Sequence, residues 1–380
     1  MPNRTRPRLA AVADHMTATR AKNPVSAPVK QKAATIRPAF GICGMEVPAG
    51  SRATVDLPIS LLSTHTPMAL PVHVVHGRRD GPTLFVSAAV HGDEIIGIEV
   101  VRRLLKLSSI RNIRGTLLCI PVVNVFGLIS HSRYLPDRRD LNRSFPGSEN
   151  GSLAGQLAHV FLKEIVSRSD FGIDIHSAAI HRSNLPQIRV SPDQPRAMEL
   201  AEAFSPPAII TSPLRDGSLR RAAREAGVDV LVYEAGEALR FDEVAVRVGV
   251  KGILRVMHHL GMIRSSRARP SNLASVHSSS TYWIRAPQGG IVRSTKSLGG
   301  RVDVGDIIGY VADPMGETES PIEARKAGIV IGLTNMPVVN RGDALFHVAE
   351  PIKLGTAQQR IEQLETEILE DPLFDEDEII

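Results

Sequence analysis

The sequence predicts an α/β fold, a mixed sheet flanked by helices, followed by a small C-terminal β sandwich. Two observations carry this prediction. Between residues 50 and 262, apolar runs typical of buried strands alternate with segments whose apolar residues recur at helical spacing. From residue 282 to 348, the chain consists instead of short β-rich runs separated by glycines. A chain of 380 residues is long enough for two such domains.

The elements of the first region follow one another along the chain. Two runs of alternating polar and apolar residues between Arg52 and Val75 predict a pair of strands. The continuous apolar run Thr83–Val90 predicts a strand that is buried on both faces, and Glu94–Leu107 predicts the helix after it. The same alternation predicts further strands and helices at 115–123, 153–166, 171–175, 195–204, 219–226, 228–233 and 241–260.

Changes in composition divide the chain into five segments. The predicted division is a basic flexible tail at 1–37, an α/β domain at 38–264, a linker or loop at 265–280, a β domain at 281–350 and an acidic tail at 351–380. A weak internal repeat supports the β domain, because Val302–Ile308 and Val339–Leu345 share a sequence pattern with Gly-Asp at its centre. The repeat predicts two similar halves of a sandwich.

Composition argues against several classes of protein. Aromatic residues make up 4% of the chain, so the stacking platforms of proteins that bind single-stranded nucleic acid are poorly supplied. The first 40 residues carry a net charge of +7 and the last 20 a net charge of −9, which leaves +7 in the middle without a basic block. No apolar run reaches the ~18 residues of a membrane span. We therefore expect a soluble, cytoplasmic protein with no nucleic-acid or membrane partner.

Two histidines and a glutamate stand at the ends of predicted strands. His91 and Glu94 follow the strand that ends at Val90, and His176 follows the apolar run Phe171–Ile175. Because ligands collect at the carboxyl ends of strands in open α/β sheets, we expect these side chains in one crevice. Two His and one Glu form the three-ligand pattern of catalytic zinc, with a fourth position open to water. With two cysteines in the chain, a Cys-rich metal site is excluded.

Each part of this motif also has a purely structural interpretation. His91 and Glu94 can simply interact with the dipole of the helix that follows them. His176, taken alone, can be an ordinary buried histidine. Asp174 either supports His176 from behind or faces away from it, since one residue separates the two. The occurrence of all three ligands at strand ends favours the metal site.

Two further motifs carry groups suited to substrate binding and proton transfer. Asn142 and Arg143 place an amide beside a planar guanidinium, which suits fixed recognition of a carboxylate; a polar turn is the structural alternative. Glu234 ends an apolar run, where a buried acid is costly unless it is paired, lies near a metal or transfers protons. An ordinary strand-end carboxylate is the alternative. Glu237, beyond a glycine, is expected to be exposed.

Together and in this order, the motifs resemble the succinylglutamate desuccinylase/aspartoacylase family, relatives of the zinc carboxypeptidases. The resemblance spans about residues 50–350 and rests on His91–Glu94, Asp140–Arg143, Asp174–His176 and Glu234–Gly236. It implies a zinc carboxypeptidase-like catalytic domain at 38–264, followed by the β domain.

The resemblance also implies roles for particular residues. One Zn²⁺ per chain would be bound by His91, Glu94 and His176. Asn142 and Arg143 would hold a substrate carboxylate, and Glu234 would serve as the general base and acid. The family's further substrate arginines have several candidates in this sequence, namely Arg133, Arg138, Arg220, Arg221 and Arg224.

The expected function is a zinc-dependent amidohydrolase that removes an acyl group from an N-acylated amino acid, or a similar small amide, with a free carboxylate. That small-molecule carboxylate is the expected partner. The sequence is also compatible with a homo-oligomer. A metallocarboxypeptidase for short peptides is one alternative, and a non-catalytic scaffold with a vestigial metal site is another. We expect the β domain to shape access to the site rather than to supply catalytic groups.

Overall fold

A computed structural model describes residues 37–264 and 274–352, together with 359, 361–363 and 366. The predicted basic tail at 1–37 and acidic tail at 351–380 therefore lie almost entirely outside the described residues, as do residues 265–273 of the predicted linker. Within the described ranges, no helix is long and apolar enough to cross a membrane.

The predicted α/β region forms a mixed sheet. Its strands are β3 (Ser51–Leu61), β4 (Pro67–His76), β5 (Arg79–Ala88), β6 (Arg114–Ile120), β7 (Phe171–Ala178), β8 (Arg182–Val190), β9 (Ala208–Thr211) and β10 (Asp229–Glu237). Strands β6, β5, β7 and β10 run parallel in that order. Strands β4 and β8 flank them in the antiparallel direction, and β3 pairs with β4. A short hairpin of β1 (Phe40–Ile42) and β2 (Met45–Val47) precedes the sheet. The mixed α/β class is confirmed.

Helices pack on both faces of this sheet. They are α1 (Ile96–Lys106), α2 (Val125–Ile129), α3 (Leu153–Glu164), α4 (Pro195–Phe204), α5 (Leu219–Glu225) and α6 (Glu243–His259). Alternate residues of β5 face different cores: Val86 packs with α1, α4 and α6, whereas Phe85 packs with α3 and α5. This arrangement explains the continuous apolar run, because both faces of the strand are covered. Burial of one such apolar side chain contributes about 1.5–3 kcal/mol to the stability of the fold.

Strands β8 and β9 were not among the predicted elements. Polar residues and Pro186 interrupt the apolar pattern of β8, and β9 is only four residues long. Proline lacks a backbone N–H and is tolerated in a strand only where no neighbour needs it, so the sequence pattern did not indicate a strand here. The omission matters because β8 lies beside β10 and contributes side chains to the candidate site.

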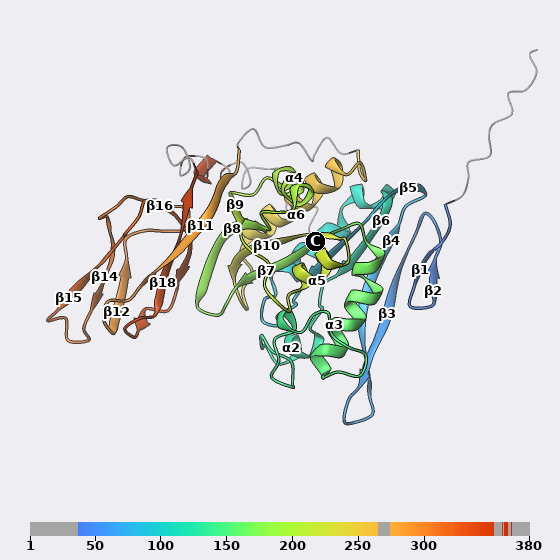
Figure 1. Ribbon diagram of the computed structural model, residues 1–380, viewed down its shortest axis with the longest axis horizontal. Helices are drawn as coiled ribbons and strands as arrows, with labels where there is room; N and C mark the ends of the chain where they lie inside the picture. Colours follow the sequence, from blue (N-terminus) through green and yellow to red (C-terminus); the bar gives the residue numbers. More distant parts are fainter. Residues whose placement is uncertain (1–36, 265–273, 353–358, 360, 364–365, 367–380) are drawn as a thin grey trace, which may run out of the picture. The chain divides into compact units, whose positions relative to one another are not determined.

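The C-terminal strands are divided between this sheet and a second one (Figure 1). They are β11 (Val276–Arg285), β12 (Gly290–Ser294), β13 (Arg301–Val302), β14 (Ile307–Ala312), β15 (Glu319–Glu323), β16 (Gly328–Thr334), β17 (Val338–Val339) and β18 (Ala344–Pro351). Strand β11 joins β9, β18 joins β11, and β16 joins β18 and also β8, which closes β8, β9, β11, β18 and β16 into a ring. Strand β11 begins at Val276, inside the predicted linker. One sheet thus runs through both predicted domains.

A second sheet, in the order β15-β14-β12-β17, shares a core with the end of the large sheet. The repeated Gly-Asp pattern forms two turns of the same construction. Asp306 Oδ2 accepts a hydrogen bond from the backbone N–H of Asp303 at 3.1 Å, and Asp343 Oδ2 accepts one from Asn340 at 2.7 Å. The glycine before each Asp has a positive φ, which a side chain would disfavour. Each turn carries the chain from one sheet to the other.

Candidate active site

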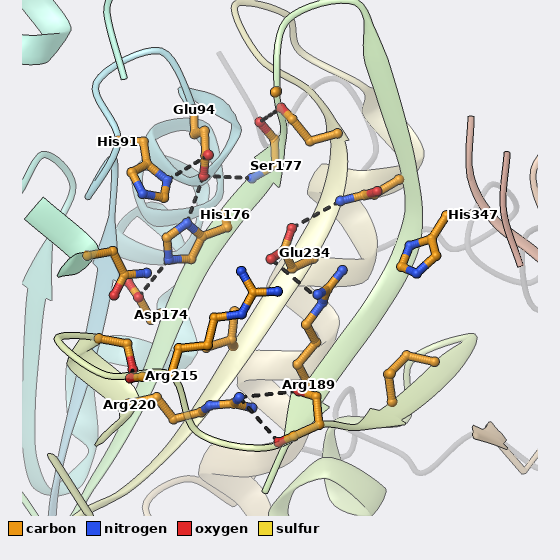
Figure 2. A pocket seen from close by; sticks show the side chains of 18 of the residues that line it. His91, Glu94, Asp174, His176, Ser177, Arg189, Arg215, Arg220, Glu234 and His347 are labelled. Carbon is orange, nitrogen blue, oxygen red and sulfur yellow. Dashed lines mark hydrogen bonds and ion pairs between the residues drawn. The ribbon is translucent and has the colours of Figure 1, made fainter. Parts of the chain in front are cut away.

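The three predicted metal ligands converge at the carboxyl ends of β5 and β7 (Figure 2). His91 and Glu94 lie between β5 and α1, and His176 lies in β7. Nδ1 of His91 and Nδ1 of His176 are each 2.7 Å from a different carboxylate oxygen of Glu94. All three residues are buried, and one ligand atom from each lies within 4.8 Å of the others. This geometry brings together the donors of one ion site.

A carboxylate orients each histidine from behind. Nε2 of His176 lies 2.8 Å from Oδ2 of Asp174, whose other oxygen accepts a hydrogen bond from Ser87 Oγ at 2.8 Å. Nε2 of His91 lies 3.2 Å from Oδ1 of Asp140. Such outer partners fix the ring orientation and raise the basicity of a metal-binding imidazole. Asp174 therefore supports His176 and does not face away from it.

The donor set fits a divalent ion such as Zn²⁺. A neutral imidazole has one N–H, so a ring that donates to the carboxylate behind it presents the Nδ1 lone pair to the centre. Burial raises the pKa of Glu94, but the attraction of His91 and His176 outweighs burial and holds the pKa below its ordinary value. Burial lowers the pKa of His176, but Asp174 and Glu94 outweigh it and raise the pKa, so a cation that binds there would take the place of a proton.

The turn that carries His91 has no room for a side chain at Gly92. A Cβ atom there would come within 1.9 Å of the backbone carbon of Gly127. Backbone cannot give way as the end of a flexible side chain can, so this close approach explains the glycine between the ligands.

We expect Asp174→Asn to weaken Zn²⁺ binding by about 10- to 100-fold, because loss of an outer carboxylate frees the imidazole and lowers its basicity. Competition with a chelating indicator measures this change. Asp229→Asn is the matched control, since Asp229 lies at the opposite end of β10, where it accepts a hydrogen bond from Gln194. Equal zinc affinity of the Asp174→Asn protein and the unmodified protein would show that Asp174 does not orient the ligand.

Glu234 lies beside the ligand group. In the parallel pair β10–β7, Glu234 is the register partner of His176, and Figure 2 shows its carboxylate between His176 and Arg189. Oε2 of Glu234 accepts a hydrogen bond from Nδ2 of Asn184 at 3.0 Å, and Oε1 is 3.7 Å from Nε of Arg189. Two residues of β8 thus hold the predicted acid in place, and both were missed because β8 was not predicted.

The expectation that Glu237 is exposed is wrong. Its side chain is 12% exposed, accepts hydrogen bonds from the backbone N–H of His181 at 2.9 Å and from Nδ2 of Asn335 at 2.8 Å, and does not line the pocket. A register shift between Glu234 and Glu237 separates the two acids. Glu237 therefore fastens a surface loop.

Asn142 and Arg143 both line the pocket, on a short 3₁₀ turn at Leu141–Arg143. Oδ1 of Asn142 accepts a hydrogen bond from the backbone N–H of Leu219 at 2.9 Å, which ties the turn to the start of α5. Within the described part of the chain, the amide nitrogen of Asn142 makes no hydrogen bond. Asp140 also connects the turn to the metal-ligand group. Its Oδ1 accepts a hydrogen bond from the backbone N–H of Asn142 at 2.8 Å and lies 3.2 Å from Nε2 of His91.

The structure separates the candidates for the further substrate arginines. Two of them line the pocket, namely Arg133 and Arg220, and three do not, namely Arg138, Arg221 and Arg224. Arg133 is already paired, at 3.0 Å from Asp140 and 3.2 Å from Glu94. Arg133 therefore braces the ligand group, which leaves Arg220 as the better candidate for an anion.

Arg220 has a donor nitrogen without an acceptor among the described residues. Its Nη2 donates to the carbonyl oxygen of Pro213 at 3.0 Å, but its buried Nη1 has no hydrogen-bond partner in the described part of the chain. Burial lowers its pKa to about 10, with repulsion from Arg189 and Arg215 adding to the effect and attraction to Glu234 opposing it. A guanidinium destabilised by burial and by like charges is suited to binding an anion.

One cavity of about 550 Å³ joins all these groups. Six cationic side chains line it: Arg133, Arg143, Arg182, Arg189, Arg215 and Arg220. Three carboxylates line it: Glu94, Asp174 and Glu234. Figure 2 shows the guanidinium of Arg215 pointing toward Glu234. The cationic excess draws anionic ligands into the cavity.

An α/β fold that places two histidines and two glutamates at strand ends, around an open cationic pocket, provides groups that suit metal binding and hydrolysis. The comparison with known families agrees. Residues 80–260 match the model of the succinylglutamate desuccinylase/aspartoacylase catalytic domain. Residues 80–260 are therefore similar to the catalytic domain of that family, which confirms the predicted resemblance.

Individual relatives match over most of their length. The chain is 28% identical over 336 residues to an N-alpha-acetyl-L-2,4-diaminobutyric acid deacetylase of Halomonas elongata, covering 82% of this chain and 98% of the relative. A succinylglutamate desuccinylase/aspartoacylase structure from Rhodobacter sphaeroides aligns with a TM-score of 0.69 and 27% identity, over 79% of this chain and 96% of its own. The product-bound ectoine utilization protein of Ruegeria pomeroyi shares the fold, with a TM-score of 0.71 and 22% identity over 83% and 99% of the two chains.

Proposed function

We propose that this protein is a zinc-dependent deacylase that hydrolyses the amide of a small N-acyl amino acid with a free carboxylate. The observation that carries the proposal is the joining of the His91, Glu94 and His176 group, the Glu234 carboxylate and the Asn142–Arg143 turn in one pocket. The deacetylase named among its relatives acts on an acylated amino acid, which supports the same class of substrate.

The proposed reaction assigns each group one task. When bound, zinc supplies Lewis-acid polarisation of a carbonyl group and an activated water. Glu234 takes a proton from the attacking water and returns it to the leaving amine, so the C–N bond breaks and a carboxylic acid and an amine are formed. Asn184 and Arg189 hold the Glu234 carboxylate toward the His176 side of the pocket during both transfers.

The pocket charges support an anionic substrate. The Arg143 guanidinium and the Asn142 amide nitrogen offer adjacent donors that suit a carboxylate. Arg220 adds a buried donor without a partner in the described residues. A guanidinium out of water is costly unless an anion meets it, so a free carboxylate on the substrate is the group that these donors fit.

A screen of N-acyl amino acids against zinc-loaded protein tests the proposed function, with dipeptides measured in parallel. We expect release of free amino acid from the acyl compounds and little from the dipeptides. Activity confined to the dipeptides would favour a carboxypeptidase. A protein that neither contains zinc nor takes it up would favour a scaffold with a vestigial site.

Arg143→Lys is expected to lower kcat/KM by about 10- to 100-fold, because lysine keeps the charge but loses the planar fork, whose charged hydrogen bonds contribute roughly 1.5–3 kcal/mol. Amidation of the substrate carboxylate should lower the kcat/KM of the unmodified enzyme at least as much. It should lower the kcat/KM of the Arg143→Lys enzyme much less, since both changes remove the same contact. Arg138→Lys is the control, because Arg138 lies outside the pocket. If amidated and free substrates are hydrolysed equally well, Arg143 has a structural role only.

A further inference from the structure

Strand β8 carries an amide that contacts the proposed catalytic acid. Nδ2 of Asn184 donates a hydrogen bond to Oε2 of Glu234 at 3.0 Å, and within the described part of the chain the Asn184 side chain makes no other. Both residues line the cavity that contains the metal-ligand group. A side chain held by one hydrogen bond keeps its orientation only if packing on its other side fixes it as well.

An extra residue in β8 turns Asn184 toward Glu234. In the pairing of β8 with β10, Glu234 lies opposite Gln187 and Gly236 lies opposite Asn184, so two residues along β10 correspond to three along β8. In a regular strand, residues 184 and 187 would point to opposite faces of the sheet. The resulting bulge places Asn184 on the face that carries Glu234, as bulges beside active sites often do.

Strand β16 packs against this amide from the other side. Gly332 is the register partner of Asn184 in the β16–β8 pair and of His347 in the β16–β18 pair. A Cβ atom at Gly332 would lie 3.0 Å from Oδ1 of Asn184 and 3.2 Å from Cβ of His347. The φ of Gly332 is not positive, so backbone conformation does not require a glycine there. The close approach of its neighbours does, because the space of a side chain is already occupied.

Of these two neighbours, His347 is the more firmly held. Its ring stacks on Trp283, with centroids 4.4 Å apart and planes 5° from parallel, and its Nε2 lies 2.9 Å from Oγ1 of Thr281. The contact with position 332 is made by Cβ of His347, which moves only with the backbone. The Asn184 amide can rotate about its side-chain bonds. A methyl group at position 332 should therefore displace the amide and break its bond to Glu234.

We propose that Gly332 and Asn184 are positioning residues for the catalytic acid, because close contact with the β16 backbone at Gly332 holds the Asn184 amide in the orientation that donates to Glu234. Through this contact, the C-terminal strands act on the chemical step itself, in addition to shaping access to the site. The inference deepens the proposed function, on which it rests, since Glu234 is the group assigned to proton transfer.

Asn184→Asp tests the donated hydrogen bond. Aspartate has the size and shape of asparagine, but it replaces the donor nitrogen with a second acceptor. We expect kcat to fall by roughly 10- to 100-fold, as for the loss of a charged hydrogen bond, while KM and zinc content stay unchanged. Full activity of the Asn184→Asp enzyme would overturn the inference, because a purely structural role would tolerate a side chain of equal size.

A double-mutant cycle tests whether Gly332 acts through Asn184. Gly332→Ala should lower kcat by about tenfold in the otherwise unmodified enzyme, but by less than about twofold in the Asn184→Ala enzyme, whose amide is already absent. Equal fold-changes in the two backgrounds would show that the glycine serves only the fold. Ile331→Val is the matched control, since it removes a methyl group from the next residue of the same strand. Ile331 packs in a core with Leu185 and Ile329, so this change should leave kcat unchanged.

A crystal structure of the Gly332→Ala protein makes the test independent of turnover. It should show Nδ2 of Asn184 beyond hydrogen-bond distance of Glu234, and an amide that still donates to Glu234 would overturn the inference. A displaced amide in a protein that hydrolyses no N-acyl amino acid would support the positioning contact and defeat the deacylase proposal. Hydrolysis by the unmodified protein, together with an undisturbed amide in the variant, would do the reverse.

Discussion

Replacing Glu234 with glutamine should lower kcat by ~10² to 10⁴ while zinc content stays unchanged, since a positioned acid/base typically contributes that much to a rate. Glutamine preserves the size of the side chain and can still contact Asn184, but it cannot take a proton from water. Steady-state kinetics with the best N-acyl amino acid, together with metal analysis of the same sample, measures both quantities.

Glu237 provides a matched control for this prediction. It belongs to the same strand but bonds to the His181 backbone and the Asn335 side chain, outside the pocket. Glu237→Gln should therefore keep full activity. If Glu237→Gln is the inactive variant and Glu234→Gln is not, the roles of the two acids are inverted.

Loss of any one metal ligand should abolish both zinc binding and hydrolysis. His91→Ala, Glu94→Ala and His176→Ala each remove one of three converging donors, and two remaining donors do not make a catalytic site. The fold should survive, because the apolar cores on both faces of the sheet do not include these residues. Zinc content by elemental analysis and a cooperative unfolding transition measure the two effects separately.

His159→Ala is the control, since His159 lies in α3 and outside the pocket. It should keep zinc and activity. Full zinc occupancy of the His176→Ala protein would show that the third ligand has been assigned wrongly.

The sequence predicted the central elements well for a physical reason. Strands β5 and β7 are buried on both faces, so their apolar runs are continuous, and the polar residues that end them stand out. This contrast singles out His91, Glu94 and His176 in the sequence. Helix α4 has a proline at its first turn and apolar spacing through Phe204, and its predicted bounds match the structure.

The pocket residues that the sequence did not predict are brought together by contacts between distant segments of the chain. Asn184 and Arg189 belong to β8, whose polar and proline-containing sequence is favourable only because β10 and β16 pair with it. Trp283 and His347 are sixty-four residues apart and meet only through the pairing of β11 with β18. Local periodicity contains no information about such pairings.

The positive charge of the candidate arginines does not show which of them lines the pocket. Arg220, Arg221 and Arg224 share one short helix, in which Arg221 is turned away from Arg220 and Arg224 lies one turn further along from Arg220. Only Arg220 faces the pocket, while Arg221 pairs with Glu225 on the surface. The phase of a helix relative to a distant cavity requires the tertiary structure.

The central claim is that this protein is a zinc deacylase with one ion at His91, Glu94 and His176. Its most direct test is a titration of metal-free protein with Zn²⁺, in which the free amino acid released from an N-acyl amino acid is measured. The rate of release should rise with added Zn²⁺ and level off at one equivalent per chain. Release that is unaffected by Zn²⁺, or no release at one equivalent from any N-acyl amino acid in the screen, would contradict it.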